Sequence, residues 1–258
     1  MQNYILYYNA SEPFCKDGLT ILIFIWEGVI LNILALLAHP DDVECICAGT
    51  LLKYRQAGHN IYIALTTSGN TGSNHIGSRE EIMNIREAEQ LNAAKYLNAE
   101  VMFLRYEDES VFDTPFTRRS VLTAIRWANP DVIFTHAPRD HSTDHNMTSK
   151  LVTAVLPYVA DKAADADLPP IDKKPHVFFE GKKCFVDITE QLATKMVMLR
   201  SYESQIAWMG TFYEEKDFTE QLEAQARMLG KWAGGMEYAE GFDAYKAVGQ
   251  IADYRLLP

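Results

Sequence analysis

An abrupt change from apolar to charged residues constrains the fold of this chain more than any other feature. The apolar run Ile33–Ala38 is short and bounded by polar residues, which is typical of a strand buried on both faces of a parallel sheet. Pro40 cannot donate a hydrogen bond to a sheet, so we expect the strand to end by His39. Asp41 and Asp42 then suit the start of a helix, where free backbone N–H groups favour carboxylates.

Strand and helix patterns alternate after this point. We expect strands at 60–67, 101–104 and 131–135, and helices at 43–57, 78–97 and 117–128. This order predicts a Rossmann-like three-layer α/β/α sandwich with a mostly parallel central sheet. Further along, we expect short strands at 177–179 and 184–187 and helices at 189–202 and 218–229, after an exposed loop or lid at 161–174.

The first part of the chain contains a nearly continuous apolar stretch, Leu19 to Ala38, that has the length of a membrane span. Its second half is the strand described above, and its first half is too short to cross a bilayer, so no membrane partner is expected. We predict a single domain at 30–258, preceded by an extension at 1–29. This extension is an extra strand, a loosely attached segment or the product of an upstream start codon.

Charge and cysteine content exclude several classes of protein. The 258 residues carry a net charge of −11, which argues against nucleic acid or an anionic membrane surface as a partner. The four cysteines do not form the pattern of a disulfide framework. We interpret Cys45 and Cys47 as small buried residues and expect the protein to be cytoplasmic.

A second polar cluster, T-H-A-P-R-D-H-S-T-D-H-N at 135–146, follows the expected strand at 131–135. Because the carboxyl ends of parallel strands share one edge of a sheet, we expect this loop to lie near the first one. Catalytic zinc sites use three His, Asp or Glu ligands, and hydrolysis also needs an unbound carboxylate as base. The two loops together offer such groups: His39, Asp41, Asp42, His136, Asp140, His141, Asp144 and His145.

These motifs resemble those of the LmbE-like, or PIG-L, zinc-dependent N-deacetylases. The resemblance rests on A-H-P-D-D at 38–42, G-T-L at 49–51 and D-H at 144–145. The T-S-G-N-T-G loop, the I-R-E-A-E helix, V-D-I-T-E-Q-L-A-T-K and S-Y-E-S-Q support it, and it extends over about residues 31–245. It implies the Rossmann-like fold and hydrolysis of an N-acetyl group.

The resemblance also implies a role for each matching residue. His39, Asp42 and His145 would hold one Zn²⁺ per chain, and Asp41 would be the general base that activates the attacking water. The substrate would be a small N-acetylated sugar or glycoconjugate of the N-acetylglucosamine type. Arg79 would contact the sugar.

The resemblance implies that Asp108 would contact the sugar as well.

One position departs from the family pattern. Many members carry a histidine three residues before the last zinc ligand, where it stabilises the oxyanion. This chain has Ser142 there, and a serine hydroxyl cannot carry positive charge. His141, one position earlier, or His176, near a later strand, would then have to supply the imidazole.

Other interpretations of the same residues remain open. Asp41 and Asp42 also fit simple helix caps, and Arg86 with Glu89 fits an ion pair on a helix face. His136 fits a hydrogen-bonded core residue. The aromatic residues near 208–213 fit the core or a subunit contact, which leaves a homo-oligomer possible.

Three further functions are alternatives to deacetylation. One is an amidase that acts on another small N-acyl conjugate. A second is a non-catalytic metal- or sugar-binding protein that lost turnover together with the oxyanion histidine. A nucleotide-binding Rossmann protein is disfavoured, because no G-x-G-x-x-G follows the first strand of the domain.

Overall fold

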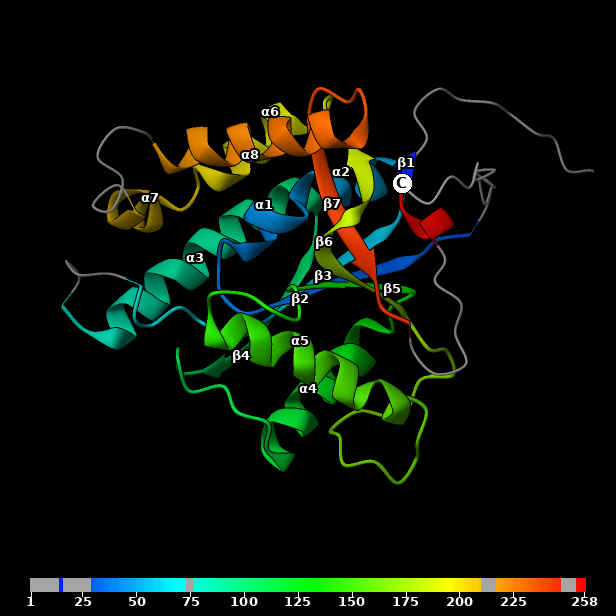
Figure 1. Ribbon diagram of the computed structural model, residues 1–258. Helices are drawn as coiled ribbons and strands as arrows, with labels where there is room; N and C mark the ends of the chain where they lie inside the picture. The colour runs from blue at the N-terminus through cyan, green and yellow to red at the C-terminus, as the bar shows by residue number, and fades with distance from the viewer. Residues whose placement is uncertain (1–13, 16–28, 73–76, 210–216, 247–253) are drawn as a thin grey trace, which may run out of the picture.

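A seven-stranded sheet forms the centre of the computed structural model, which describes residues 14–15, 29–72, 77–209, 217–246 and 254–258 (Figure 1). The strands run in the order β1-β6-β5-β2-β3-β4, and β7 also pairs with β6. They are β1 (Phe14–Cys15), β2 (Asn32–Leu37), β3 (Asn60–Thr67), β4 (Glu100–Tyr106), β5 (Val132–Thr135), β6 (His176–Asp187) and β7 (Ala239–Ala244). β5, β2, β3 and β4 pair in parallel, as do β5 and β6, whereas β1 and β7 are antiparallel to β6. The predicted α/β fold is confirmed.

Helices cover both faces of this sheet (Figure 1). One hydrophobic cluster joins the sheet to α1 (Asp42–Ile46), α2 (Ala48–Gln56), α3 (Arg79–Leu97), α6 (Leu192–Leu199) and α8 (Phe218–Ala233). The opposite cluster joins it to α4 (Pro115–Ala128) and α5 (Thr143–Val155). The remaining short elements are α7 (Glu203–Met209) and the 3₁₀ turns η1 (Leu156–Tyr158) and η2 (Tyr254–Leu256).

Strand β2 is buried on both faces, as its apolar run predicts. Ile33, Ala35 and Leu37 point into the cluster beneath α1–α3, while Leu34 and Leu36 point into the cluster beneath α4 and α5. All five side chains are fully buried. Full burial on both faces explains why this strand is a continuous apolar run without polar alternation.

The position of β2 also determines where a ligand can bind. From β2 the chain adds β3 and β4 on one side, and β5 then pairs with the other side of β2. The loops that follow β2 and β5 therefore leave the same edge of the sheet in different directions. Such a switch point is where open α/β sheets leave a crevice for ligands.

The expected helix at 43–57 is two helices, because the chain breaks at Cys47 with φ −142° and ψ 5°. The Glu240 carboxylate of β7 accepts hydrogen bonds there from the backbone N–H groups of Gly49 and Thr50, at 2.9 and 2.8 Å. It thereby caps α2 and stabilises the break. The two short strands expected at 177–179 and 184–187 are likewise one strand, β6, with an irregularity between Glu180 and Cys184.

The loop at 161–174 is not a lid over the strand ends. It leads from α5 and η1 into the start of β6, at the opposite edge of the sheet. The buried guanidinium of Arg126 donates hydrogen bonds to the carbonyl oxygens of Tyr158, Val159, Asp161 and Leu168, which fastens this segment to α4. The apolar residues at 19–26 lie outside the described part, and within the described residues no helix is long and apolar enough to cross a membrane.

A buried ion pair beneath the hairpin should contribute strongly to stability. Lys195 Nζ lies 2.7 Å from Glu240 Oε1, and both side chains are almost inaccessible to water. We expect Lys195→Met to lower the free energy of unfolding by about 3–5 kcal/mol, because it leaves the Glu240 carboxylate buried without its counter-charge. Lys183→Met, which breaks the exposed pair with Asp243, should cost at most about 1 kcal/mol. Urea unfolding of the two variants checks this difference; equal losses would contradict it.

Candidate metal centre and active site

The loop after β2 turns back on itself so that Asp42 lies beside His39. The Asp42 carboxylate accepts a hydrogen bond from the backbone N–H of His39 at 2.6 Å. The helix α1 begins at Asp42, so its first turn and the strand end are joined by one side chain. This local hydrogen bond fixes the direction of both residues before any contact with the second loop.

The second loop brings His145 into contact with this pair. His39 Nδ1 lies 3.2 Å from His145 Nε2 and 3.4 Å from Asp42 Oδ2, and His145 Nε2 lies 3.4 Å from Asp42 Oδ1. In a tetrahedral zinc site with bonds of about 2.0–2.1 Å, ligand atoms lie about 3.3–3.4 Å apart. The three predicted ligands therefore converge at close to this spacing, with Asp42 facing His39 through Oδ2 and His145 through Oδ1, and two imidazoles with one carboxylate form a donor set common in catalytic zinc sites.

Each of the two imidazoles contacts a carboxylate through the ring nitrogen that does not face the other candidate ligands. His39 Nε2 lies 3.2 Å from Asp144 Oδ2, and His145 Nδ1 lies 3.2 Å from Asp140 Oδ1. Carboxylates in this position orient metal-binding histidines and make the metal-facing nitrogen a better donor. Residues 140–146 are themselves fixed, because the Asn146 side chain bonds the backbone of Asp140 in both directions.

His136 is fully buried beneath this group. Its Nε2 accepts a hydrogen bond from the N–H of Ala38 at 2.9 Å and lies 3.2 Å from Asp42 Oδ2. Its ring stacks on that of His145 at 3.8 Å between centroids. The interpretation of His136 as a hydrogen-bonded core residue fits, but the residue also forms the base on which His145 rests.

Asp41 lies beside the three ligands and is held by Arg86. It has a φ of 97°, a left-handed conformation that costs a non-glycine residue about 1–3 kcal/mol. The buried Arg86 guanidinium donates to the carbonyl oxygens of Pro40 at 2.7 Å and Gly69 at 3.0 Å, and lies 3.4 Å from Asp41 Oδ2. A Cβ at Gly69 or Gly72 would collide with this guanidinium, so both glycines are needed for its close packing.

Burial and charge shift the titration of these groups. Burial raises the pKa of Asp41 to about 7, although the Arg86 charge opposes the rise. Burial alone would lower the pKa of both imidazoles. Hydrogen bonds to Asp144 and Asp42 nevertheless raise the pKa of His39 to about 9, and the charge of Asp42 with the Asp140 contact raises the pKa of His145 to about 10. The charges of His145 and His136 outweigh burial and hold the pKa of Asp42 well below its usual range.

Comparison with known proteins adds an independent line of support. The model of the family described as PIG-L, GlcNAc-PI de-N-acetylase, matches residues 34–156, which contain both loops of the site. Residues 34–156 are therefore similar to the PIG-L family. The match begins in β2 and ends at the close of α5, so the candidate ligands all lie within the matched residues.

Individual relatives extend the similarity beyond residues 34–156. A diacetylchitobiose deacetylase of Thermococcus kodakarensis is 23% identical over 227 residues, 82% of each chain. A probable N-acetyl-alpha-D-glucosaminyl L-malate deacetylase 2 of Bacillus anthracis is 26% identical over 196 residues, which is 68% of this chain and 82% of that protein. The solved N,N'-diacetylchitobiose deacetylase of Pyrococcus horikoshii superimposes with a TM-score of 0.73 at 22% identity and covers 83% of each chain, which shows a shared fold.

The two residues predicted to bind sugar have different surroundings. Asp108 is buried, with Oδ1 at 4.0 Å from His39 Nε2, and its Oδ2 accepts hydrogen bonds from Thr71. Arg79 is exposed at the start of α3 and pairs with Glu107 at 2.9 Å. The site thus brings Asp108 next to the ligand cluster and leaves Arg79 at the rim; their sugar contacts stay predictions.

The two candidates for the oxyanion imidazole differ in position. His141 Nδ1 lies 2.8 Å from Asp140 Oδ1, its side chain is 89% exposed, and its ring packs edge-on against His145. His176 opens β6 and pairs with Val132, the first residue of β5. It therefore lies at the opposite edge of the sheet, and the prediction that His176 reaches the site is wrong. Ser142 caps α5 through the N–H of His145.

Sequence reasoning missed the role of the long helix α3. Arg86 was expected to pair with Glu89 on a solvated face, but both are buried. Glu89 instead accepts hydrogen bonds from the N–H and hydroxyl of Ser204, at the start of α7. The two glycines of T-S-G-N-T-G could have indicated this contact of Arg86, because glycines in a loop permit close approach of another group to the backbone.

We expect Asp140→Asn to weaken zinc binding by about 10- to 100-fold, because the amide lacks the negative charge with which the carboxylate holds the His145 N–H and makes Nε2 a better donor. Competition with a zinc chelator measures this change. Asp165→Asn, in the exposed loop before β6, should leave zinc affinity unchanged. Equal affinities of the Asp140 variant and the wild type would show that this carboxylate does not support the ligand.

The pKa values predict how metal binding depends on pH. Without metal, His39 and His145 are protonated at neutral pH, because their pKa values of about 9 and 10 lie above it. A metal requires the neutral imidazoles and must displace these protons. Zinc affinity should therefore rise toward pH 9 by about 10-fold per pH unit for each proton released, and weaken in acid. Isothermal titration in buffers of different ionisation enthalpy measures the protons released; a pH-independent affinity would contradict the assignment.

Proposed function

We propose that this protein is a zinc-dependent hydrolase that removes the N-acetyl group from an N-acetylglucosamine-type sugar or glycoconjugate. The observation that carries the proposal is the convergence of His39, Asp42 and His145 at ligand spacing, with the Asp41 carboxylate beside them. Relatives named as deacetylases of N-acetylated sugars support the same reaction. The fit of two imidazoles and one carboxylate supports zinc as the metal.

His39, Asp42 and His145 would hold the ion. Zinc in such a site supplies a Lewis acid that polarises the acyl carbonyl and lowers the pKa of water. Asp41 would take the proton of the attacking water. Its pKa of about 7 suits a base that works near neutral pH, and Arg86 keeps the side chain in one orientation.

The developing oxyanion needs a group that stabilises its negative charge, and the leaving amine needs a proton donor. His141 is the candidate that the loop after β5 offers: Asp140 lies 2.8 Å from its Nδ1, so Nε2 is the ring nitrogen that this carboxylate does not engage. An imidazolium in that position stabilises negative charge and can return a proton to the amine. Ser142 would not take this role, because it caps α5.

The alternatives differ from this proposal in measurable ways. An amidase for another small N-acyl conjugate would use the same centre with a different acyl or amine group. A metal- or sugar-binding protein without turnover would bind zinc and release no amine. A screen of N-acetylated sugars with an amine-detecting reagent separates these cases.

Asp41→Asn should lower turnover by about 10²- to 10⁴-fold, because the amide cannot accept the water proton. Its zinc content should stay near one ion per chain, since Asp41 is not among the converging ligands. Amine release and metal analysis of the same preparation check both statements, with Asp165→Asn as the matched control. Persistent turnover in the Asp41 variant, or activity that survives a strong chelator, would contradict the mechanism.

A further inference from the structure

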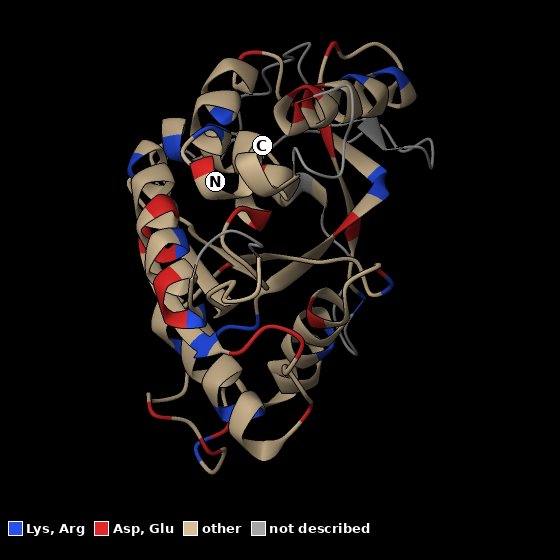
Figure 2. Cartoon of the chain, turned by 90° about the vertical axis from the view of Figure 1, so that its left-hand side faces the viewer, with Lys and Arg blue, Asp and Glu red and all other residues tan. Residues whose placement is uncertain are grey.

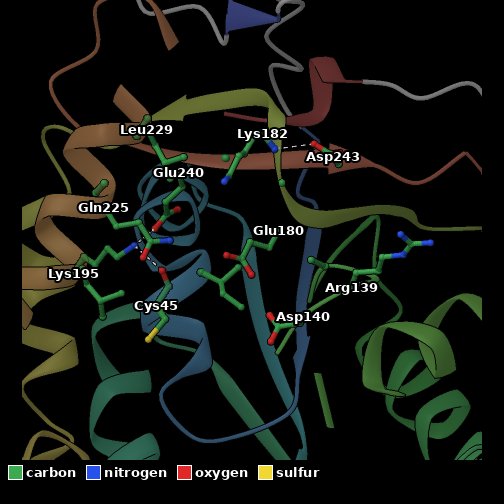
Figure 3. A pocket seen from close by; sticks show the side chains of 17 residues that line it. Cys45, Arg139, Asp140, Glu180, Lys182, Lys195, Gln225, Leu229, Glu240 and Asp243 are labelled. Atoms are coloured by element: carbon green, nitrogen blue, oxygen red, sulfur yellow. Dashed lines mark hydrogen bonds and ion pairs between the residues drawn. The ribbon is translucent and has the colours of Figure 1, made fainter. Parts of the chain in front are cut away.

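A cavity of about 400 Å³ lies beside the metal centre, between the loop after β5, the β6–β7 hairpin and helix α8 (Figure 3). Asp140 lines it and also supports the ligand His145, so the cavity borders the site where the N-acetyl group would react. Its volume falls within the range of about 300–1,000 Å³ that small-molecule sites occupy. The reaction described above does not use this space.

An irregularity in β6 directs Glu180 into the cavity. Glu180 and Cys184 both pair with Phe242 of β7, so the residues between them bulge out of the hairpin. Asp243 Oδ1 accepts hydrogen bonds from the N–H groups of Lys182 and Lys183 at 2.8 and 3.0 Å and fixes the bulge. A Cβ at Gly181 would collide with that carboxylate. Bulges beside active sites commonly re-aim one side chain.

The Glu180 carboxylate has no hydrogen-bond or ion-pair partner among the residues that the structure describes. Figure 3 shows it between Asp140 and the Lys195–Glu240 pair. Burial and the negative charges of Asp140 and Asp42 raise the pKa of Glu180. A partly buried carboxylate without partners is costly unless a ligand donates to it.

Within the described part of the chain, none of the three cationic side chains that line the cavity forms an ion pair with Glu180, although the charge of Lys182 acts on it. Lys195 is paired with Glu240, and Lys182 Nζ lies over the Trp232 ring at 4.9 Å. Arg139 is exposed and extends away from Glu180 (Figure 3). A carboxylate or phosphate in the cavity would approach the carboxylates of Glu180 and Asp140, whereas sugar hydroxyls can donate to Glu180 and accept from Gln225.

Acidic residues outnumber Lys and Arg in the chain, 35 to 24, and Figure 2 shows both kinds distributed over its elements. Together with the net charge of −11, this disfavours anionic ligands at long range as well.

We propose that this cavity binds a second, uncharged sugar ring attached to the N-acetylated one, and that Glu180 selects it by accepting its hydroxyl hydrogen bonds. The proposal rests on the deacetylase function above and narrows it to neutral disaccharides or longer glycans, in preference to sugars with an anionic substituent.

The test compares zinc-loaded wild type and Glu180→Gln on N-acetylglucosamine, N,N'-diacetylchitobiose and N-acetylglucosamine 1-phosphate. We expect the ratio of kcat/KM for the disaccharide over the monosaccharide to fall about 10-fold in Glu180→Gln, through KM, because a charged acceptor is lost. The kcat/KM of Glu180→Gln for N-acetylglucosamine 1-phosphate should be higher than that of the wild type. Glu100→Gln, an exposed carboxylate at the start of β4, is the matched control and should match the wild type.

Gln225→Trp, which fills the cavity from α8, should also lower the ratio of kcat/KM for the disaccharide over the monosaccharide, without any change of charge. An unchanged ratio in both variants, or a wild type that prefers the phosphorylated sugar, would overturn the proposal. If the wild type releases amine from none of the three sugars, the proposed function fails instead. Titration of diacetylchitobiose into wild type and Glu180→Gln then still tests the cavity, because tenfold weaker binding by the variant is required.

Discussion

The rest of the site depends on the contacts of the Asp42 carboxylate. It closes the loop after β2 through the N–H of His39, begins α1, and lies within 3.4 Å of imidazole nitrogens of His39, His136 and His145. A buried carboxylate is stable only when opposite charges and donors surround it. His39 and His145 supply both when they are protonated, so the loops after β2 and β5 are held together by the same side chains that would bind a metal.

Arg86 stabilises the part of the site that contains Asp41. Its guanidinium joins the loop after β2 to the loop after β3 through two carbonyl oxygens, and it supports Asp41 in a strained backbone conformation. Strain of this kind persists where surrounding contacts over-determine it, which is typical of functional sites. One buried side chain of α3 thus positions a candidate base and connects three segments that are distant in sequence.

The β6–β7 hairpin gives the second half of the chain a direct part in the site. Glu240 caps α2 and pairs with Lys195, which places the hairpin over the break between α1 and α2. The bulge at Gly181 then turns Glu180 toward Asp140. The hairpin thus stabilises the core and also shapes the cavity beside the candidate metal centre.

The sequence by itself determined the order of most strands and helices and the buried strand β2. These follow from short-range patterns, namely apolar runs, Pro40 and acidic residues at helix starts. The three residues that converge at ligand spacing were singled out by the family resemblance of A-H-P-D-D and D-H, among eight polar candidates in the two loops. Only the tertiary structure decided the partners of Arg86, the position of His176, the split helix and the strand β7, whose sequence A-E-G-F-D-A has little strand character. Each depends on contacts between residues far apart in the chain, such as Glu240 with Gly49, which no local pattern encodes.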